Sequence, residues 1–258
     1  TDGTTTINTQ ANNDNVEVQT TGGDVNVNGG DDDDAILVGY VVSGDTLPTT
    51  DHLAGVLTVS GDAGDDTFTF DDRGETIDRV ISIDGDAVSG MSLHAVGYFT
   101  IETLNLFAGS GSEVLNVRGT TALTNIELND GNERIFVSSN ASADLTNADT
   151  LDFLTGDLEL LLGSELNLNV GNGRHRLMIS DEADTSGDTV SITDSAASGM
   201  EIIISGLAVS DISYGATASA SFAAGVTVWT VFGAEVIDID ATHFRNAVDG
   251  NGHALRTL

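Results

Sequence analysis

The chain has 258 residues and a formal net charge of −33, and its eight basic side chains are all arginine. This charge repels nucleic acid phosphates and anionic membrane surfaces, so neither is expected as a partner, whereas cations are strongly attracted. No run of about 18 apolar residues occurs, so no membrane span is expected. With 40% hydrophobic residues the chain can bury a sizeable core, which excludes wholesale disorder.

The first half of the chain repeats one gapped pattern. An apolar residue is followed seven positions later by an acidic residue, and apolar residues stand two and four positions after the acid. The pattern occurs at 5–18, 25–38, 57–70 and 104–117, with Asp14, Asp34, Asp66 and Glu113 as the acids. Asp34 follows Asp14 by 20 residues. A regular repeat of this kind indicates stacked, similar structural units.

Later copies have shorter turns. The segments 126–137 and 168–179 align with each other residue for residue, and further alternating runs lie at 80–84 and 99–106. Alternation with a period of two predicts strands with one buried face. Two strands of about five residues and two turns make one coil of about 20 residues. The sequence therefore predicts an all-β fold, a single right-handed parallel β-helix or β-roll solenoid with roughly 20–22 residues per coil and roughly 11 or 12 coils.

Two stretches break the alternation. Residues 39–55 hold the only proline and are expected to be an insertion within a solenoid that spans 1–240. Residues 241–258 are expected to form a short C-terminal cap or tail, with a short helix as one form of it. The N-terminus enters a repeat at once, and an uncapped coil offers unpaired strand edges. Either this is a slice of a longer protein or the ends stack on copies of themselves.

The turn at 61–69 matches the nonapeptide G-G-x-G-x-D-x-U-x at every fixed position except the second glycine. Residues 29–37 match with Asp32 in place of one glycine, 108–116 carry Glu113 in place of the aspartate, and 9–17 keep only Asp14 and Val16. The chain thus resembles the RTX (hemolysin-type) repeats and their relatives in large secreted bacterial surface proteins. The resemblance implies a parallel β-roll that binds Ca²⁺. Only one such loop is seen per coil, so a one-sided calcium ladder is expected.

The acidic loops are candidate calcium ligands. Ca²⁺ takes six to eight oxygen ligands from carboxylates and carbonyls, and glycines help turn carbonyls inward. Stacked coils would place Asp14 near Asp34 and Asp34 near Asp66. The predicted ligands are Asp31, Asp32, Asp34, Asp62, Asp65, Asp66, Asp14 and Glu113. The alternative is that glycine and aspartate simply make good tight turns.

The segment 171–176 gathers Arg174, His175 and Arg176. It could bind an anionic sugar or serve a calcium-dependent lyase. The favoured interpretation is that the arginines neutralise acids of neighbouring coils and that His175 is exposed on the turn.

These features predict a structural module of an extracellular or cell-surface bacterial assembly, such as an adhesin stalk, surface layer or filament subunit, and not an enzyme. Ca²⁺ would stiffen it. The expected partners are copies of itself or neighbouring domains that stack end to end, and a cell-surface polysaccharide is a further possible partner. The alternative is a carbohydrate-binding or polysaccharide-cleaving parallel β-helix, against which the aromatic content of 5% argues.

Overall fold

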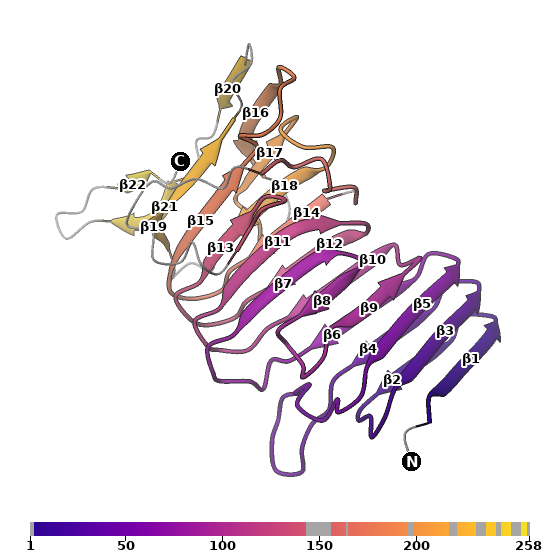
Figure 1. Cartoon of the computed structure of the whole chain (residues 1–258). Coiled ribbons are helices and arrows are strands. Elements are labelled where there is room, and N and C mark those ends of the chain that lie inside the picture. The colour runs from indigo at the N-terminus through magenta and orange to yellow at the C-terminus, as the bar shows by residue number, and fades with distance from the viewer. Residues whose placement is uncertain are drawn as a thin grey trace.

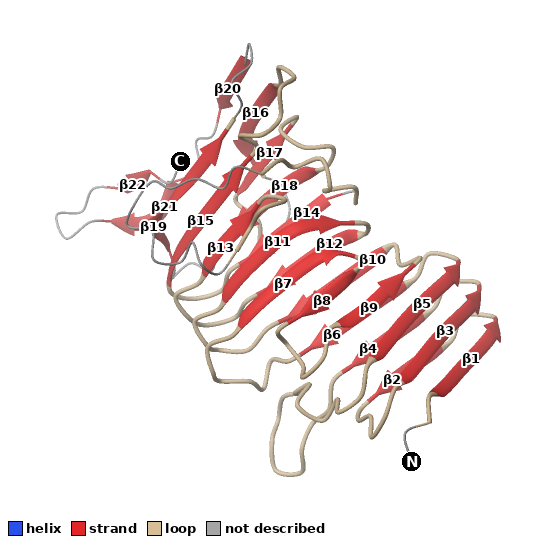
Figure 2. Cartoon of the chain, in the orientation of Figure 1, coloured by secondary structure: helices blue, strands red, loops and turns tan. Residues whose placement is uncertain are grey.

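The computed structural model describes residues 3–142, 156–163, 165–195, 199–216, 221–230, 236–240, 244–248 and 254–256. Within these ranges the regular structure is entirely β, as predicted (Figure 2). The described residues accordingly include no helix suited to crossing a membrane.

Two ten-stranded sheets form the body of the molecule (Figure 1). In spatial order, sheet A consists of β1 (Thr5–Ala11), β3 (Val25–Asp31), β5 (Leu57–Ala63), β9 (Val96–Phe99), β8 (Ala87–Ser89), β7 (Val80–Gly85), β11 (Val114–Thr120), β13 (Arg134–Val137), β15 (Arg174–Ser180) and β19 (Ser221–Trp229). Sheet B consists of β2 (Asn15–Val18), β4 (Ala35–Val38), β6 (Thr67–Asp71), β10 (Thr103–Phe107), β12 (Leu123–Glu127), β14 (Glu165–Asn169), β18 (Asp211–Gly215), β17 (Ile202–Ser205), β16 (Thr189–Asp194) and β20 (Val236–Asp240).

The chain alternates between the sheets, and each coil pairs in parallel with the next. Thr5 pairs with Val25 in sheet A, and Thr103 pairs with Leu123 in sheet B. Both pairs are 20 residues apart, which is the spacing that the repeat predicts. The parallel solenoid is therefore confirmed.

In the described part of the chain the solenoid has fewer coils than predicted, because two alternating stretches each form an antiparallel meander within a single sheet. Strands β7, β8 and β9 lie side by side in sheet A, and β16, β17 and β18 do the same in sheet B. Each meander adds two strands to its sheet. Of the ten strands in each sheet, eight remain, so the described solenoid has eight coils.

The core lies between the sheets and is built from the inward-facing residues of each strand. In β6, Phe68 and Phe70 are fully buried, whereas Thr67 and Thr69 face outward. The Phe68 ring stacks on Phe70 and contacts Tyr98, with centroids 5.9 and 6.1 Å apart. One continuous apolar cluster extends from Val18 to Phe222, so every coil buries its apolar face against its neighbours.

The two irregular stretches lie outside the sheets. Residues 39–55 connect β4 to β5 without adding a strand to either sheet. In the C-terminal segment, β21 (Phe244–Val248) and β22 (Ala254–Arg256) pair antiparallel. The helix expected as one form of this segment is therefore wrong for the described part. The remaining residues of 241–258 lie outside the described ranges.

Half-buried asparagines form a ladder along sheet B. The Asn125 amide donates to Asn105 Oδ1 at 3.0 Å, and the Asn167 amide donates to Asn125 Oδ1 at 2.9 Å. Because Asn125 is the central rung, Asn125→Ala removes both bonds, and we expect it to lower the free energy of unfolding by about 1–2 kcal/mol. Urea unfolding measures this, with the exposed Asn13→Ala as the control. Equal losses in the two variants would show that the ladder contributes nothing.

Candidate metal centres

A row of acidic side chains, of which Asp34 and Asp66 are buried, follows one edge of the solenoid, where the chain turns from sheet A to sheet B. Asp14, Asp34, Asp66 and Glu102 directly precede β2, β4, β6 and β10. The Asp14 N–H donates to Asp34 Oδ1 at 2.8 Å, the Asp34 N–H to Asp66 Oδ1 at 2.7 Å, and the Asp66 N–H to Glu102 Oε2 at 2.7 Å. The predicted proximity of Asp14 to Asp34 and of Asp34 to Asp66 is confirmed. Each carboxylate thus satisfies a backbone donor of the preceding coil.

The glycine five residues before Asp34 and the one five residues before Asp66 make room for the carboxylates. A Cβ at Gly29 would lie 2.4 Å from Asp34 Oδ2, and a Cβ at Gly61 would lie 2.3 Å from Asp66 Oδ2. Any larger residue would therefore push the carboxylate out of the coil. This contact explains why a glycine and an aspartate recur together in these turns.

The second oxygen of each buried aspartate lacks a donor. Among the described residues, Asp34 Oδ2 and Asp66 Oδ2 are buried without a hydrogen-bond partner. Burial first, and then the charges of Asp34 and Glu102, raise the pKa of Asp66. Hard cations such as Ca²⁺ prefer carboxylate oxygens of this kind.

The other predicted ligands lie outside this row. Asp31, Asp32, Asp62 and Asp65 are exposed on the same turns. Asp32 Oδ2 accepts from the Asn12 N–H at 3.1 Å, and Asp62 Oδ1 accepts from the Ser60 hydroxyl at 2.8 Å. Their assignment as calcium ligands stays a prediction.

Glu113 lies on the opposite edge, where the chain turns from sheet B to sheet A before β11. The fourth copy of the repeat therefore does not extend the row of Asp14, Asp34 and Asp66, because it spans the opposite turn of its coil. The expectation of a one-sided ladder is wrong: the acidic turns occupy one edge in the first coils and the other edge later.

On this second edge, Glu113, Glu133 and His175 form a fully buried row. His175 Nδ1 contacts the Glu133 carboxylate. The expectation that His175 is exposed is wrong, because its ring takes the inward position that the two glutamates hold in the earlier coils. Burial first, and then the charge of Glu133, raise the pKa of Glu113 to about 8.

A third acidic cluster lies in the turn between β15 and β16. One carboxylate oxygen from each of Asp181, Asp184 and Asp188 lies within 4.8 Å of the other two, so this cluster could hold a metal ion. In the described part of the chain it is the one place where three such side chains converge this closely. Burial first, opposed by the hydrogen bond from the Leu158 N–H, and then the charges of Asp184, Asp188 and Glu159 bring the pKa of Asp181 to about 7.

No protein-family model, curated protein or solved structure matches this chain.

Sequence reasoning missed the cluster of Asp181, Asp184 and Asp188, because their spacing does not fit the glycine-rich nonapeptide. A signal was nevertheless present. Residues 181–188 read DEADTSGD and residues 72–79 read DRGETIDR, with acids at the first and fourth positions of both.

Proposed function

We propose that the chain is a structural module of an extracellular bacterial assembly, in which Ca²⁺ bound in the acidic turns ties successive coils together. One observation carries this proposal: the buried carboxylates of Asp34 and Asp66 link adjacent coils, and each keeps one oxygen without a partner among the described residues. The resemblance to RTX repeats supports the same role. The continuous core and the parallel register suit a rigid spacer.

Calcium would act on the repulsion within the row. Asp34 and Asp66 lie close together and are buried, so their mutual repulsion when both are ionised opposes stacking of the coils. A divalent cation that shares the two unpartnered oxygens would replace this repulsion with attraction. The net charge of −33 raises the local concentration of cations around the whole rod.

Thermal unfolding with EDTA and with millimolar Ca²⁺ tests this role. We expect Ca²⁺ to raise Tm by about 5 °C or more, because an ion present at 100 times its Kd stabilises the folded state by about 2.7 kcal/mol. Asp66→Asn keeps the acceptor for the Asp34 N–H and removes the charge, so it should lose part of this rise. Asp45→Asn, at an exposed position in the 39–55 insertion, is the matched control. If Tm does not respond to Ca²⁺, the acidic residues only form tight turns and do not bind the ion.

The N-terminal coil supports end-to-end stacking. Strands β1 and β2 stand at the ends of their sheets, and a hollow of about 550 Å³ opens there beside Ile7, Val18 and Val25. Among the described strands, none pairs with the outer edge of β1, and an edge of this kind can pair with another strand. We propose that a second copy of the chain packs on this edge. Light scattering should show species that lengthen with concentration, and a monomer at high concentration would contradict the stacking.

A further inference from the structure

Two turns of the chain, 72–79 and 181–188, are copies of one another. The first turn follows β6 and the second follows β15, and both of these strands pair in parallel with strands of neighbouring coils. Each turn leads into the first strand of a meander, β7 in sheet A and β16 in sheet B. Aligned without a gap, Asp72 corresponds to Asp181 and Glu75 to Asp184.

The backbone contacts of the two turns agree position by position. The first aspartate accepts a backbone N–H from a distant loop, at 2.8 Å from Thr50 to Asp72 Oδ1 and at 2.9 Å from Leu158 to Asp181 Oδ1. Its carbonyl accepts the N–H of the second acid, Glu75 or Asp184, at 2.9 and 3.2 Å.

The second acid also behaves alike in the two copies. One carboxylate oxygen of Glu75 accepts the N–H groups of the next two residues, and Asp184 Oδ1 does the same. The two turns therefore place their acidic groups in equivalent positions.

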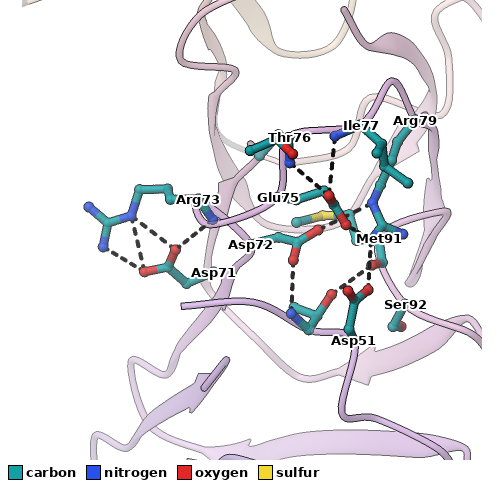
Figure 3. A network of polar contacts seen from close by, with 12 residues as sticks. Asp51, Asp71, Asp72, Arg73, Glu75, Thr76, Ile77, Arg79, Met91 and Ser92 are labelled. Atoms are coloured by element: carbon teal, nitrogen blue, oxygen red, sulfur yellow. Dashed lines mark hydrogen bonds and ion pairs between the residues drawn. The ribbon is translucent and has the colours of Figure 1, made fainter. Parts of the chain in front are cut away.

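The first turn contains its own cation. Arg79 follows Asp72 by seven residues, and its guanidinium pairs with Asp72 at 3.6 Å, with Asp51 at 2.8 Å and with Glu75 (Figure 3). Three carboxylates from two separate loops thus surround one positive group. Asp72 is 1% exposed, and Arg79 is the cation that compensates its buried charge.

The second turn has an acid where the first has the arginine. Asp188 follows Asp181 by seven residues, and its carboxylate lies with those of Asp181 and Asp184. Glu159 corresponds to Asp51, since each directly follows the residue that donates to the first aspartate, and its charge acts on Asp181. Three carboxylates and a guanidinium leave two net negative charges, and four carboxylates with a divalent cation leave the same two.

The burial and the few hydrogen bonds of these carboxylates point to the same conclusion. Asp181 is 2% exposed, and among the described residues its carboxylate accepts one hydrogen bond, from the Leu158 N–H. Asp188 Oδ2 is buried and has no hydrogen-bond partner among the described residues. Carboxylates in these positions need a cation or a proton.

We propose that the 181–188 turn binds a divalent, oxygen-preferring cation of the Ca²⁺ class in the place that the Arg79 guanidinium occupies in the 72–79 turn. Two oxygens on one Ca²⁺ lie at most about 5 Å apart, and the separations of up to 4.8 Å between these carboxylates fit that limit. The ion ties the turn to the loop that carries Leu158, as Arg79 ties its turn to the loop that carries Asp51. This site does not depend on the proposed calcium ions beside Asp34 and Asp66.

Exchanging the two residues between the turns tests the proposal. Isothermal titration calorimetry of the full chain with Ca²⁺, and separately with Mg²⁺, gives the number of ions bound. Asp188→Arg should bind one ion fewer than the wild type. Because the new guanidinium replaces the ion, removing Ca²⁺ with EDTA should no longer cost this turn its stabilisation, and the Tm of the variant should fall less in EDTA than that of the wild type. Arg79→Asp should bind one ion more and should depend on Ca²⁺ for its stability.

Asp188→Asn is the conservative companion, and Asp45→Asn is the matched control. Loss of one bound ion in Asp188→Asn, with the control unchanged, supports the site even where Asp188→Arg fails to fold. If Asp188→Asn binds as many ions as the wild type, the proposed site is wrong, and the buried carboxylates of the cluster are neutralised by protons instead. If Asp66→Asn loses the response to Ca²⁺ while Asp188→Asn responds like the wild type, metal binding is confined to the row of Asp14, Asp34 and Asp66. This result would also overturn the proposal.

Discussion

In EDTA, Glu113 alone is expected to lower the free energy of unfolding of this protein by about 4 kcal/mol as the pH rises from 4.5 to 8. Glu113 is 1% exposed, and its Oε2 lacks a hydrogen-bond partner among the described residues. Its pKa is raised from 4.5 to about 8 in the folded protein, by burial first and then by the charge of Glu133.

The direction of this effect follows from proton binding. Between pH 4.5 and pH 8 the unfolded chain has released the Glu113 proton, whereas the folded chain retains it. The folded state therefore binds more protons in this range, and its stability decreases with rising pH. Asp181 and Asp72, whose pKa values are raised to about 7 and about 6, act in the same direction.

Urea unfolding at several pH values between 4.5 and 8, all in EDTA, measures the effect. Glu113→Gln keeps the shape of the side chain and cannot ionise, so its stability should fall by about 4 kcal/mol less than that of the wild type over this range, and the remaining slope comes from groups such as Asp181 and Asp72. Glu17→Gln, at an exposed position, should retain the wild-type slope. A wild-type stability that rises over this range, or an unchanged slope in Glu113→Gln, would contradict the prediction.

The fold could be predicted from the sequence because its determinants are local and repeated. Alternation such as that of Phe68 and Phe70 marks the buried face, and the 20-residue offset between Asp14 and Asp34 is the length of a coil. The meanders could not be predicted in this way. Alternation in 80–84 shows that a strand has one buried face, but it does not tell whether the next strand runs parallel or antiparallel to it.

The acidic turns could be predicted only in part. Their place between strands follows from glycine and aspartate, and the stacking of Asp34 on Asp66 follows from the repeat. Which edge a turn occupies depends on how many strands precede it. The prediction that Glu113 lies on the same edge as Asp14, Asp34 and Asp66 was therefore wrong. The burial of His175 could not be read from its charged neighbours, because adjacent residues in a strand face opposite sides.

The metal cluster at Asp181 required three-dimensional information. Its residues are three and four positions apart, and the two groups that act on Asp181 from outside the turn, the Leu158 N–H and the Glu159 carboxylate, come from a loop more than 20 residues earlier. Only the comparison with the turn that contains Arg79 identifies what is missing from it. In this chain, internal repetition substitutes for the relatives that an alignment would normally supply.

The glycine that begins the best-preserved acidic turn should be among the least replaceable residues. A Cβ at Gly61 would lie 2.3 Å from Asp66 Oδ2 and 2.3 Å from the Thr100 carbonyl oxygen. Neither group can move freely, because Asp66 accepts the Asp34 N–H through its other oxygen and Thr100 belongs to the adjoining coil. We therefore expect Gly61→Ala to lower the free energy of unfolding by about 3 kcal/mol, as overpacking in a tight interior does.

Gly22→Ala is the matched control, because a Cβ at Gly22 would meet no atom within 4 Å. It should leave stability within about 0.5 kcal/mol of the wild type. Urea unfolding of both variants in EDTA separates crowding at Gly61 from any loss of metal, and a second titration in Ca²⁺ tests the coupling between them. If Gly61→Ala displaces the Asp66 carboxylate, it should also reduce the stabilisation by Ca²⁺, whereas Gly22→Ala should retain it. A Gly61→Ala variant as stable as Gly22→Ala would show that the carboxylate can leave the coil at little cost, and the acidic row would then be a consequence of tight turns rather than a link between coils.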